Sequence, residues 1–176
     1  MNIANKVTMV RLVMIPIFVG AFYHYGTSYN IAAILFMIAS LTDAVDGHLA
    51  RSRNLITNFG KFVDPLVDKV LTMAAFIVLV EAGTIPAWAV IIIIARELII
   101  TGFRTLAADM GITIAASMWG KAKTTSQMIS LVLLLLNNQA LNKFGIYVFY
   151  IAVILTLISG IDYIVKNKKV LDLENI

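Results

Sequence analysis

The succession of long apolar runs, separated by short polar turns, constrains this chain most. Six runs are each long enough, or nearly long enough, to cross a bilayer as a helix. They cover residues 7–23, 31–51, 64–79, 87–107, 123–136 and 144–165. Only 14% of residues are charged, which is too few for a soluble domain of 176 residues. We therefore expect an all-α integral membrane protein, a bundle of six transmembrane helices in which residues 1–176 form one domain.

The sequence also predicts where two of these helices start. The fifth run is the shortest in apolar residues, and we expect its helix to start near Lys123. The third helix is expected to start at Asp64 and Pro65, because proline is favoured in the first turn of a helix.

The basic residues give the expected orientation. With six spans both termini lie on one side, and that side collects Lys6, Arg51, Arg53, Lys61, Arg104, Lys121, Lys123, Lys166, Lys168 and Lys169. Lys143 alone falls on the other side. The positive-inside rule then places both termini at the cytoplasmic face of the cytoplasmic (inner) membrane. The net charge of +4 does not indicate nucleic acid, since basic residues punctuate apolar runs and form no stripe. The chain has no cysteine, which excludes disulfides and thiolate sites.

Four carboxylates sit between strongly apolar segments. Asp43 and Asp46 are three residues apart, and Asp64 and Asp68 are four apart, so each pair shares one face of a helix. Acids in such surroundings are costly to bury without a cation or a hydrogen-bond donor. If the two helices are neighbours, the four oxygen ligands converge. Such a cluster suits a hard divalent ion such as magnesium, calcium or manganese.

Small and basic residues accompany these acids. Gly47 and Gly60 leave room for a ligand, and Arg51 and Arg53 provide fork-shaped donors for phosphate. The complete pattern is Asp43-x2-Asp46-Gly47-x2-Ala50-Arg51-x8-Gly60-x3-Asp64-x3-Asp68. It resembles, without a gap or substitution, the signature of the CDP-alcohol phosphotransferase family.

The resemblance implies that family's fold, a homodimer, and a reaction. The four aspartates would hold Mg²⁺ or Mn²⁺, as two ions, which bind the pyrophosphate of a CDP-linked lipid. Asp68 would be the catalytic base, and the nucleotide would lie against Gly47, Ala50, Arg51 and Gly60. An acceptor hydroxyl would attack the β-phosphorus, and CMP would leave.

Three further stretches resemble the phosphatidylglycerolphosphate synthase branch of that family: NIANKVTMVRLVMIPIF near the amino terminus, ARELIITGFR at 95–104 and GKAKTTSQM at 120–128. That branch commonly has proline where this chain has Ala4. The resemblance implies CDP-diacylglycerol and glycerol 3-phosphate as substrates. The acceptor's phosphate needs cations, and Arg104, Lys121 and Lys123 are the candidates. Ordinary positive-inside anchoring explains each of them equally well.

Several polar residues keep two interpretations. Asn5, Thr8 and Arg11 form one helical face that could meet a phosphate of the CDP-lipid, or Arg11 snorkels to the interface. Three others, Thr124, Thr125 and Gln127, serve the acceptor hydroxyls or bond helix to helix.

Arg96 and Glu97 lie inside an apolar run, which makes both functional candidates. Because they are adjacent, they point to different sides of the helix and are not expected to pair with each other. We expect Arg96 near the acid cluster, and Glu97 in an ion pair or an acceptor pocket.

Two other functions remain open. The first is the same chemistry with another acceptor, such as inositol phosphate, serine or a phospholipid. The second is a small cation transporter, since intramembrane acids occur there too. Against transport, the acids gather near one face, whereas a conducting path needs polar groups through the membrane's depth.

Overall fold

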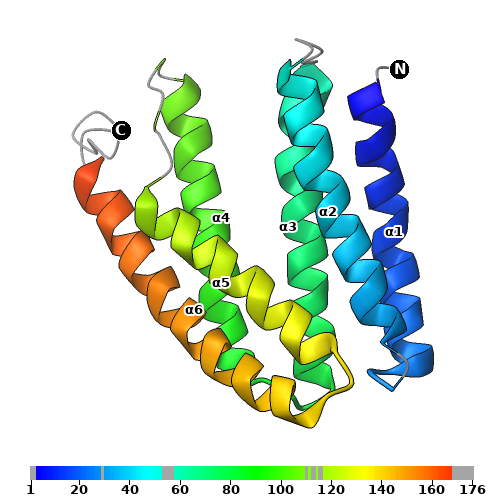
Figure 1. The fold of residues 1–176 in the computed structure, drawn as a ribbon. Coiled ribbons are helices and arrows are strands. Elements are labelled where there is room, and N and C mark those ends of the chain that lie inside the picture. The colour runs from blue at the N-terminus through cyan, green and yellow to red at the C-terminus, as the bar shows by residue number, and fades with distance from the viewer. Residues whose placement is uncertain are drawn as a thin grey trace.

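A computed structural model describes the backbone of residues 3–28, 30–52, 58–109, 111, 114 and 117–167. Within these ranges, side chains are described except at positions 3–8, 43–52, 58–65, 68 and 109. The described residues form six α-helices and no strand (Figure 1). The helices are α1 Ile3–Tyr25, α2 Ile31–Ser52, α3 Asn58–Glu81, α4 Ala87–Asp109, α5 Met118–Leu135 and α6 Gln139–Lys166. The predicted number and order of helices are therefore confirmed.

The predicted start of α3 at Asp64 is wrong, because the helix begins at Asn58 and Pro65 lies inside it. Hydropathy indicates where a helix becomes apolar, but the helical backbone can start several residues earlier. Helix α5 likewise begins before the expected Lys123, at Met118. There Ser117 caps it by accepting a hydrogen bond from the Gly120 N–H at 3.1 Å.

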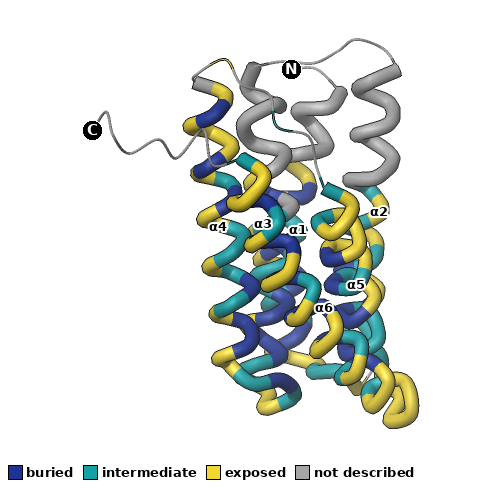
Figure 2. Tube along the Cα trace, turned by 90° about the vertical axis from the view of Figure 1, so that its left-hand side faces the viewer, coloured by how far each residue is buried: buried dark blue, intermediate teal, exposed yellow. Residues whose placement is uncertain are grey.

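The helices alternate in direction, so α1 begins and α6 ends at the same end of the bundle, which we call the terminal end (Figure 1). Helices α1, α2 and α3 form one group, and α5 and α6 form an antiparallel pair beside α4. Aromatic contacts join the helices in the core. The Phe18 and Phe36 rings lie 5.9 Å apart between α1 and α2, and Phe76 and Phe149 lie 5.8 Å apart between α3 and α6. Buried residues run down the inside of the bundle in Figure 2.

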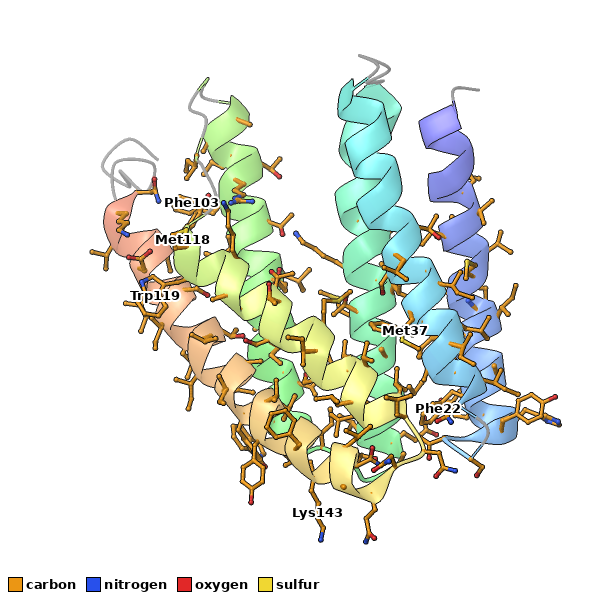
Figure 3. All side chains as sticks on the ribbon, viewed as in Figure 1. Phe22, Met37, Phe103, Met118, Trp119 and Lys143 are labelled. Atoms are coloured by element: carbon orange, nitrogen blue, oxygen red, sulfur yellow. The ribbon has the colours of Figure 1, made fainter. Side chains whose placement is uncertain are left out.

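Polar contacts join distant parts of the chain at the opposite end, which we call the turn end. The Asn137 amide Nδ2 donates to the Ser28 carbonyl at 2.8 Å, and the Asn137 N–H donates to Asn30 Oδ1. The Tyr23 hydroxyl donates to Glu81, joining α1 to α3. Lys143 also lies at this end, away from both termini (Figure 3).

Among the described residues, α6 is long and apolar enough to cross a membrane. Helices α1 and α2 contain the shorter apolar stretches Met9–Tyr25 and Ile31–Thr42. The apolar sequence of α4 is interrupted by Arg96, Glu97 and Arg104, all of which belong to the site described next. That all six helices span a membrane stays a prediction.

Candidate functional site

The four aspartates of the sequence motif lie on two neighbouring helices. Asp43 and Asp46 belong to α2, and Asp64 and Asp68 belong to α3, which contacts α2. Asp43 lies nine residues before α2 ends, and Asp68 lies ten residues after α3 begins. The two pairs are thus at similar depths below the terminal end. Four carboxylates on adjacent helices are a donor set that fits Mg²⁺ or Mn²⁺.

The side chains of these aspartates lie outside the described residues, so their convergence on a metal stays a prediction. The predicted contacts with the CDP-lipid also stay predictions at the positions whose surroundings the structure does not describe, namely Asn5, Thr8, Gly47, Ala50, Arg51 and Gly60. Of that set Arg11 is described, and its side chain is buried, with only 2% of the residue exposed. Burial inside the bundle argues against a side chain that snorkels to the membrane surface.

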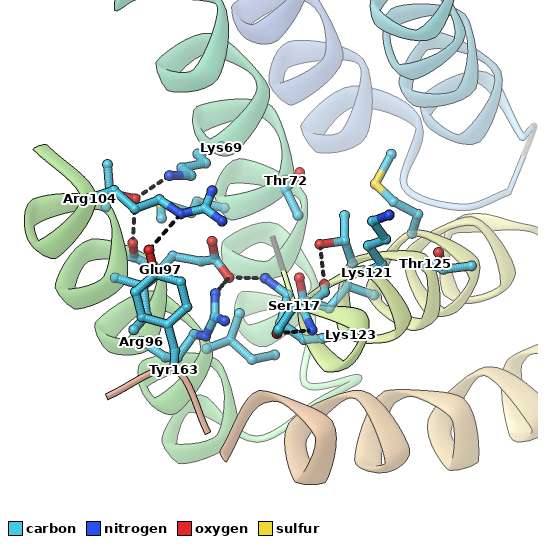
Figure 4. Close-up of a pocket in the computed structure, with 18 of the residues that line it drawn as sticks. Lys69, Thr72, Arg96, Glu97, Arg104, Ser117, Lys121, Lys123, Thr125 and Tyr163 are labelled. Atoms are coloured by element: carbon cyan, nitrogen blue, oxygen red, sulfur yellow. Dashed lines mark hydrogen bonds and ion pairs between the residues drawn. The ribbon is translucent and has the colours of Figure 1, made fainter. Parts of the chain in front are cut away.

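A cavity of about 1050 Å³ lies between α3, α4 and α5 and reaches Ser40 of α2 and Tyr163 of α6. Its described charged lining residues are five cations and one acid: Lys69, Arg96, Arg104, Lys121, Lys123 and Glu97. All three predicted acceptor-phosphate cations therefore line one cavity, and Figure 4 shows how they lie. Such a concentration of positive charge suits an anionic ligand.

Glu97 is the centre of an ion-pair cluster in this cavity. Its Oε1 accepts from the Lys123 ammonium and, at 3.3 Å, from Arg96 Nη1 (Figure 4). The Lys123 side chain is 4% exposed and that of Glu97 is 14% exposed. The expectation that Arg96 and Glu97 do not pair is wrong, because the long guanidinium side chain reaches back to its neighbour. The predicted ion pair of Glu97 is confirmed, and the residue also lines the cavity. That the cavity is the predicted acceptor pocket stays a prediction.

Arg96 passes between two glycines. A Cβ atom added at Gly160 of α6 would lie 3.3 Å from Arg96 Cγ, and one added at Gly120 of α5 would lie 3.9 Å from its Nη2. The missing side chain at Gly160 leaves room for the arginine, whereas the distance at Gly120 is an ordinary van der Waals contact. Its expected place near the acid cluster is untested, because the side chains of that cluster are not described.

Arg104 is held by a buried tyrosine. Its Nε donates to the Tyr163 hydroxyl at 3.0 Å, and its guanidinium carbon lies 5.4 Å from the centre of the Tyr163 ring. Arg104 and Lys121 remain exposed, whereas Lys123 is buried against Glu97. The three predicted cations therefore differ in how freely they can meet a ligand.

Lys69 is a cavity residue that sequence reasoning left unassigned. It follows Asp68 directly, and its ammonium donates to the Thr101 hydroxyl, which itself donates to the Glu97 carbonyl at 2.6 Å. The position of Lys69 inside an apolar run could have marked it as a functional candidate. No comparable signal marks Tyr163, whose role depends on the approach of α6 to α4.

Three polar residues of α5 line the cavity, and one of them also bonds to α6. Gln127 is buried and its Nε2 donates to the Thr156 hydroxyl of α6 at 3.3 Å, which matches the helix-to-helix interpretation. Gln127 also lines the cavity, as do Thr124 and Thr125. The Thr124 hydroxyl donates to the Gly120 carbonyl at 3.1 Å, within its own helix.

The comparison with known families covers both the aspartate helices and the cationic cavity. Residues 1–158 match the family described as CDP-alcohol phosphatidyltransferase. The chain belongs to this family. The match includes α1 to α5 and most of α6, so every residue of the cavity wall except Tyr163 falls within it.

Several relatives with curated names resemble the chain over nearly its full length. A relative from Bacillus subtilis (strain 168) is 43% identical over 99% of each chain. One from Haemophilus influenzae (strain ATCC 51907 / DSM 11121 / KW20 / Rd) is 44% identical over 93% of this chain and 91% of its own length. One from Rickettsia felis (strain ATCC VR-1525 / URRWXCal2) is 34% identical over 96% of each. All three are named CDP-diacylglycerol–glycerol-3-phosphate 3-phosphatidyltransferase.

Proposed function

We propose that this protein transfers the phosphatidyl group of CDP-diacylglycerol to glycerol 3-phosphate, giving phosphatidylglycerol phosphate and CMP. The observation that carries the proposal is the cationic cavity, whose wall includes Leu66 and Lys69 of α3, two residues before Asp68 and one after it. A phosphorylated acceptor needs positive charge next to the reacting groups. The names of the full-length relatives support the same reaction.

We propose that all six helices span the cytoplasmic membrane, with both termini in the cytoplasm and the protein a homodimer. Large apolar side chains on the outside of the described helices support the membrane placement. Ile91 of α4 is 64% exposed and Ile161 of α6 is 65% exposed, a surface that suits lipid better than water. The charged cavity then opens toward the cytoplasmic end, while the lipid tails of the donor stay in the bilayer.

The proposed metal ligands are Asp43, Asp46, Asp64 and Asp68, holding two ions of Mg²⁺ or Mn²⁺. When bound, divalent ions neutralise phosphate oxygens and align a phosphoryl displacement. In this proposal Gly47 and Gly60 leave room for the nucleotide, and Arg51 donates to its phosphates.

Asp68 is the proposed base. It takes the proton of the acceptor's 1-hydroxyl as that oxygen bonds to the β-phosphorus of CDP-diacylglycerol. The bond from this phosphorus to the oxygen bridging to CMP breaks, and CMP leaves with the electron pair. Asp68 lies one helical turn before Thr72, a cavity residue on the same helix, which supports this assignment.

Arg104, Lys121 and Lys123 are proposed to meet the acceptor's phosphate. Arg104 and Lys121 are exposed in the cavity and would touch the phosphate directly. Lys123 is already paired with Glu97, so it would meet the phosphate only by sharing its ammonium donors with that acid. An acceptor with no net negative charge, such as zwitterionic serine, would leave most of this positive charge unbalanced.

An acceptor panel tests the reaction. Purified protein in detergent is given CDP-diacylglycerol and, separately, glycerol 3-phosphate, inositol phosphate, serine or a phospholipid, with and without EDTA. We expect glycerol 3-phosphate to be the one acceptor of the panel that gives CMP release. EDTA should abolish this release, and Mg²⁺ or Mn²⁺ should restore it. Product from another alcohol but none from glycerol 3-phosphate would reject the acceptor. Ion flux in liposomes without nucleotide, and no CMP release, would favour a transporter.

Aspartate variants test the metal site. We expect Asp43→Asn and Asp68→Asn to lower CMP release at least about 10³-fold, because each removes a ligand charge and Asp68→Asn also removes the base. Glu81→Gln, an acid at the turn end, is the matched control and should retain activity. Thermal unfolding in detergent checks that each variant is folded. Normal turnover in a folded Asp68→Asn protein would disprove the assignment.

A further inference from the structure

We propose that Tyr163 is a positioning residue that orients Arg104 toward the acceptor's phosphate and thereby sets the affinity for phosphorylated acceptors. This inference rests on the proposed function. Tyr163 lies on α6, beyond the residues that match the family, and no part of the sequence motif includes it.

Tyr163 holds the arginine in two ways at once. Its hydroxyl accepts from Arg104 Nε at 3.0 Å, and its ring lies beneath the guanidinium with 5.4 Å between the ring centre and Cζ. Figure 4 shows both residues at the edge of the cavity. A hydrogen bond to Nε fixes the plane of the guanidinium, and the ring adds a cation–π attraction.

This arrangement leaves the useful part of Arg104 available. Tyr163 occupies Nε, so the two terminal nitrogens keep their donors for an anion. A guanidinium binds phosphate best through two parallel donors from one edge. An arginine already oriented loses less conformational entropy when the phosphate arrives, so binding is tighter.

Tyr163 is itself rigid, as a positioning residue must be. It is only 2% exposed, and the Phe103 ring of α4 packs edge-on against it at 5.7 Å. Its backbone carbonyl accepts from Asn167 Nδ2 at 2.7 Å at the end of α6. The tyrosine therefore occupies its place without a ligand, and α6 delivers it to the wall formed by α4.

The first test removes only the hydroxyl. Tyr163→Phe should raise KM for glycerol 3-phosphate about 3- to 10-fold, the value of one hydrogen bond, because Arg104 loses its fixed plane. We expect kcat at saturating acceptor and KM for CDP-diacylglycerol to be unchanged. Tyr147→Phe on the same helix, where the tyrosine is 69% exposed, is the matched control and should match wild type.

The second test uses the arginine. Arg104→Lys keeps the charge but has no Nε donor, so it should raise the same KM, and adding Tyr163→Phe to it should cause no further increase. A merely structural tyrosine would instead lower thermal stability and affect both substrates. Unchanged KM in Tyr163→Phe, or additive effects in the double variant, would overturn the inference. Wild-type protein inactive with glycerol 3-phosphate would reject the proposed function instead.

Discussion

At the scale of the residue, the cavity is organised by which cations already have partners. Glu97 neutralises Lys123 and draws in Arg96, while Tyr163 orients Arg104 without neutralising it. The charge of Lys123 is thus balanced by an acid of the protein, whereas the charge of Arg104 is available to a ligand. Buried charges of the first kind are expensive unless their partner stays in place.

Removing the acid of this cluster should be costly. Glu97→Gln leaves the buried Lys123 without its counter-charge, and we expect the free energy of unfolding to fall by about 3 kcal/mol. Thermal and denaturant unfolding in detergent measure this loss. The double variant Glu97→Gln with Lys123→Gln should lose less than the two single variants together. Strictly additive losses would show that the pair contributes nothing.

The residue scale also shows what sequence could predict about the site. Residue type and spacing pointed to the four aspartates, and a family resemblance pointed to the three cations, which do line one cavity. That these residues bind metal and substrate stays a prediction. The pairing of Arg96 with Glu97 depends on the length of the arginine side chain. The contact of Tyr163 with Arg104 depends on the packing of α6 against α4, which brings together residues 59 positions apart. Neither is encoded in a local pattern.

At the scale of the element, helices were predictable and their ends were not. Apolar length indicated all six helices, but α3 begins at Asn58 and α5 at Met118, before their apolar runs. A cap such as Ser117, whose side chain accepts from Gly120, decides where a helix starts, and this signal is short and easily missed.

The closest helix pair gives a prediction at this scale. Gly145 lets α6 approach α5, since an added Cβ would lie 3.0 Å from Leu133 Cβ. Gly145→Ala should therefore lower the free energy of unfolding by about 1–3 kcal/mol. Gly102→Ala in α4 is the matched control, because nothing lies within 4 Å of its added Cβ. That change should be neutral or stabilising by up to about 1 kcal/mol. Equal effects at both glycines would contradict this explanation.

At the scale of the whole molecule, the alternating helices separate the termini from Lys143. The natural absence of cysteine makes this arrangement directly measurable. Lys143→Cys should react with a membrane-impermeant maleimide from the outside of intact cells. Lys166→Cys, at an exposed position where α6 finishes at the terminal end, should react only after the membrane is opened. Labelling of both from the same side would reject the six-span topology.

The uneven charge of the cavity also bears on the folded state. Its described lining has five cations and one acid, and like charges held this closely repel one another. A phosphate-bearing molecule that enters relieves this repulsion and binds only the folded chain, so occupancy itself raises resistance to unfolding. Bound substrate would thus contribute to the stability of the fold, and a cell with little substrate would hold a protein that unfolds more readily.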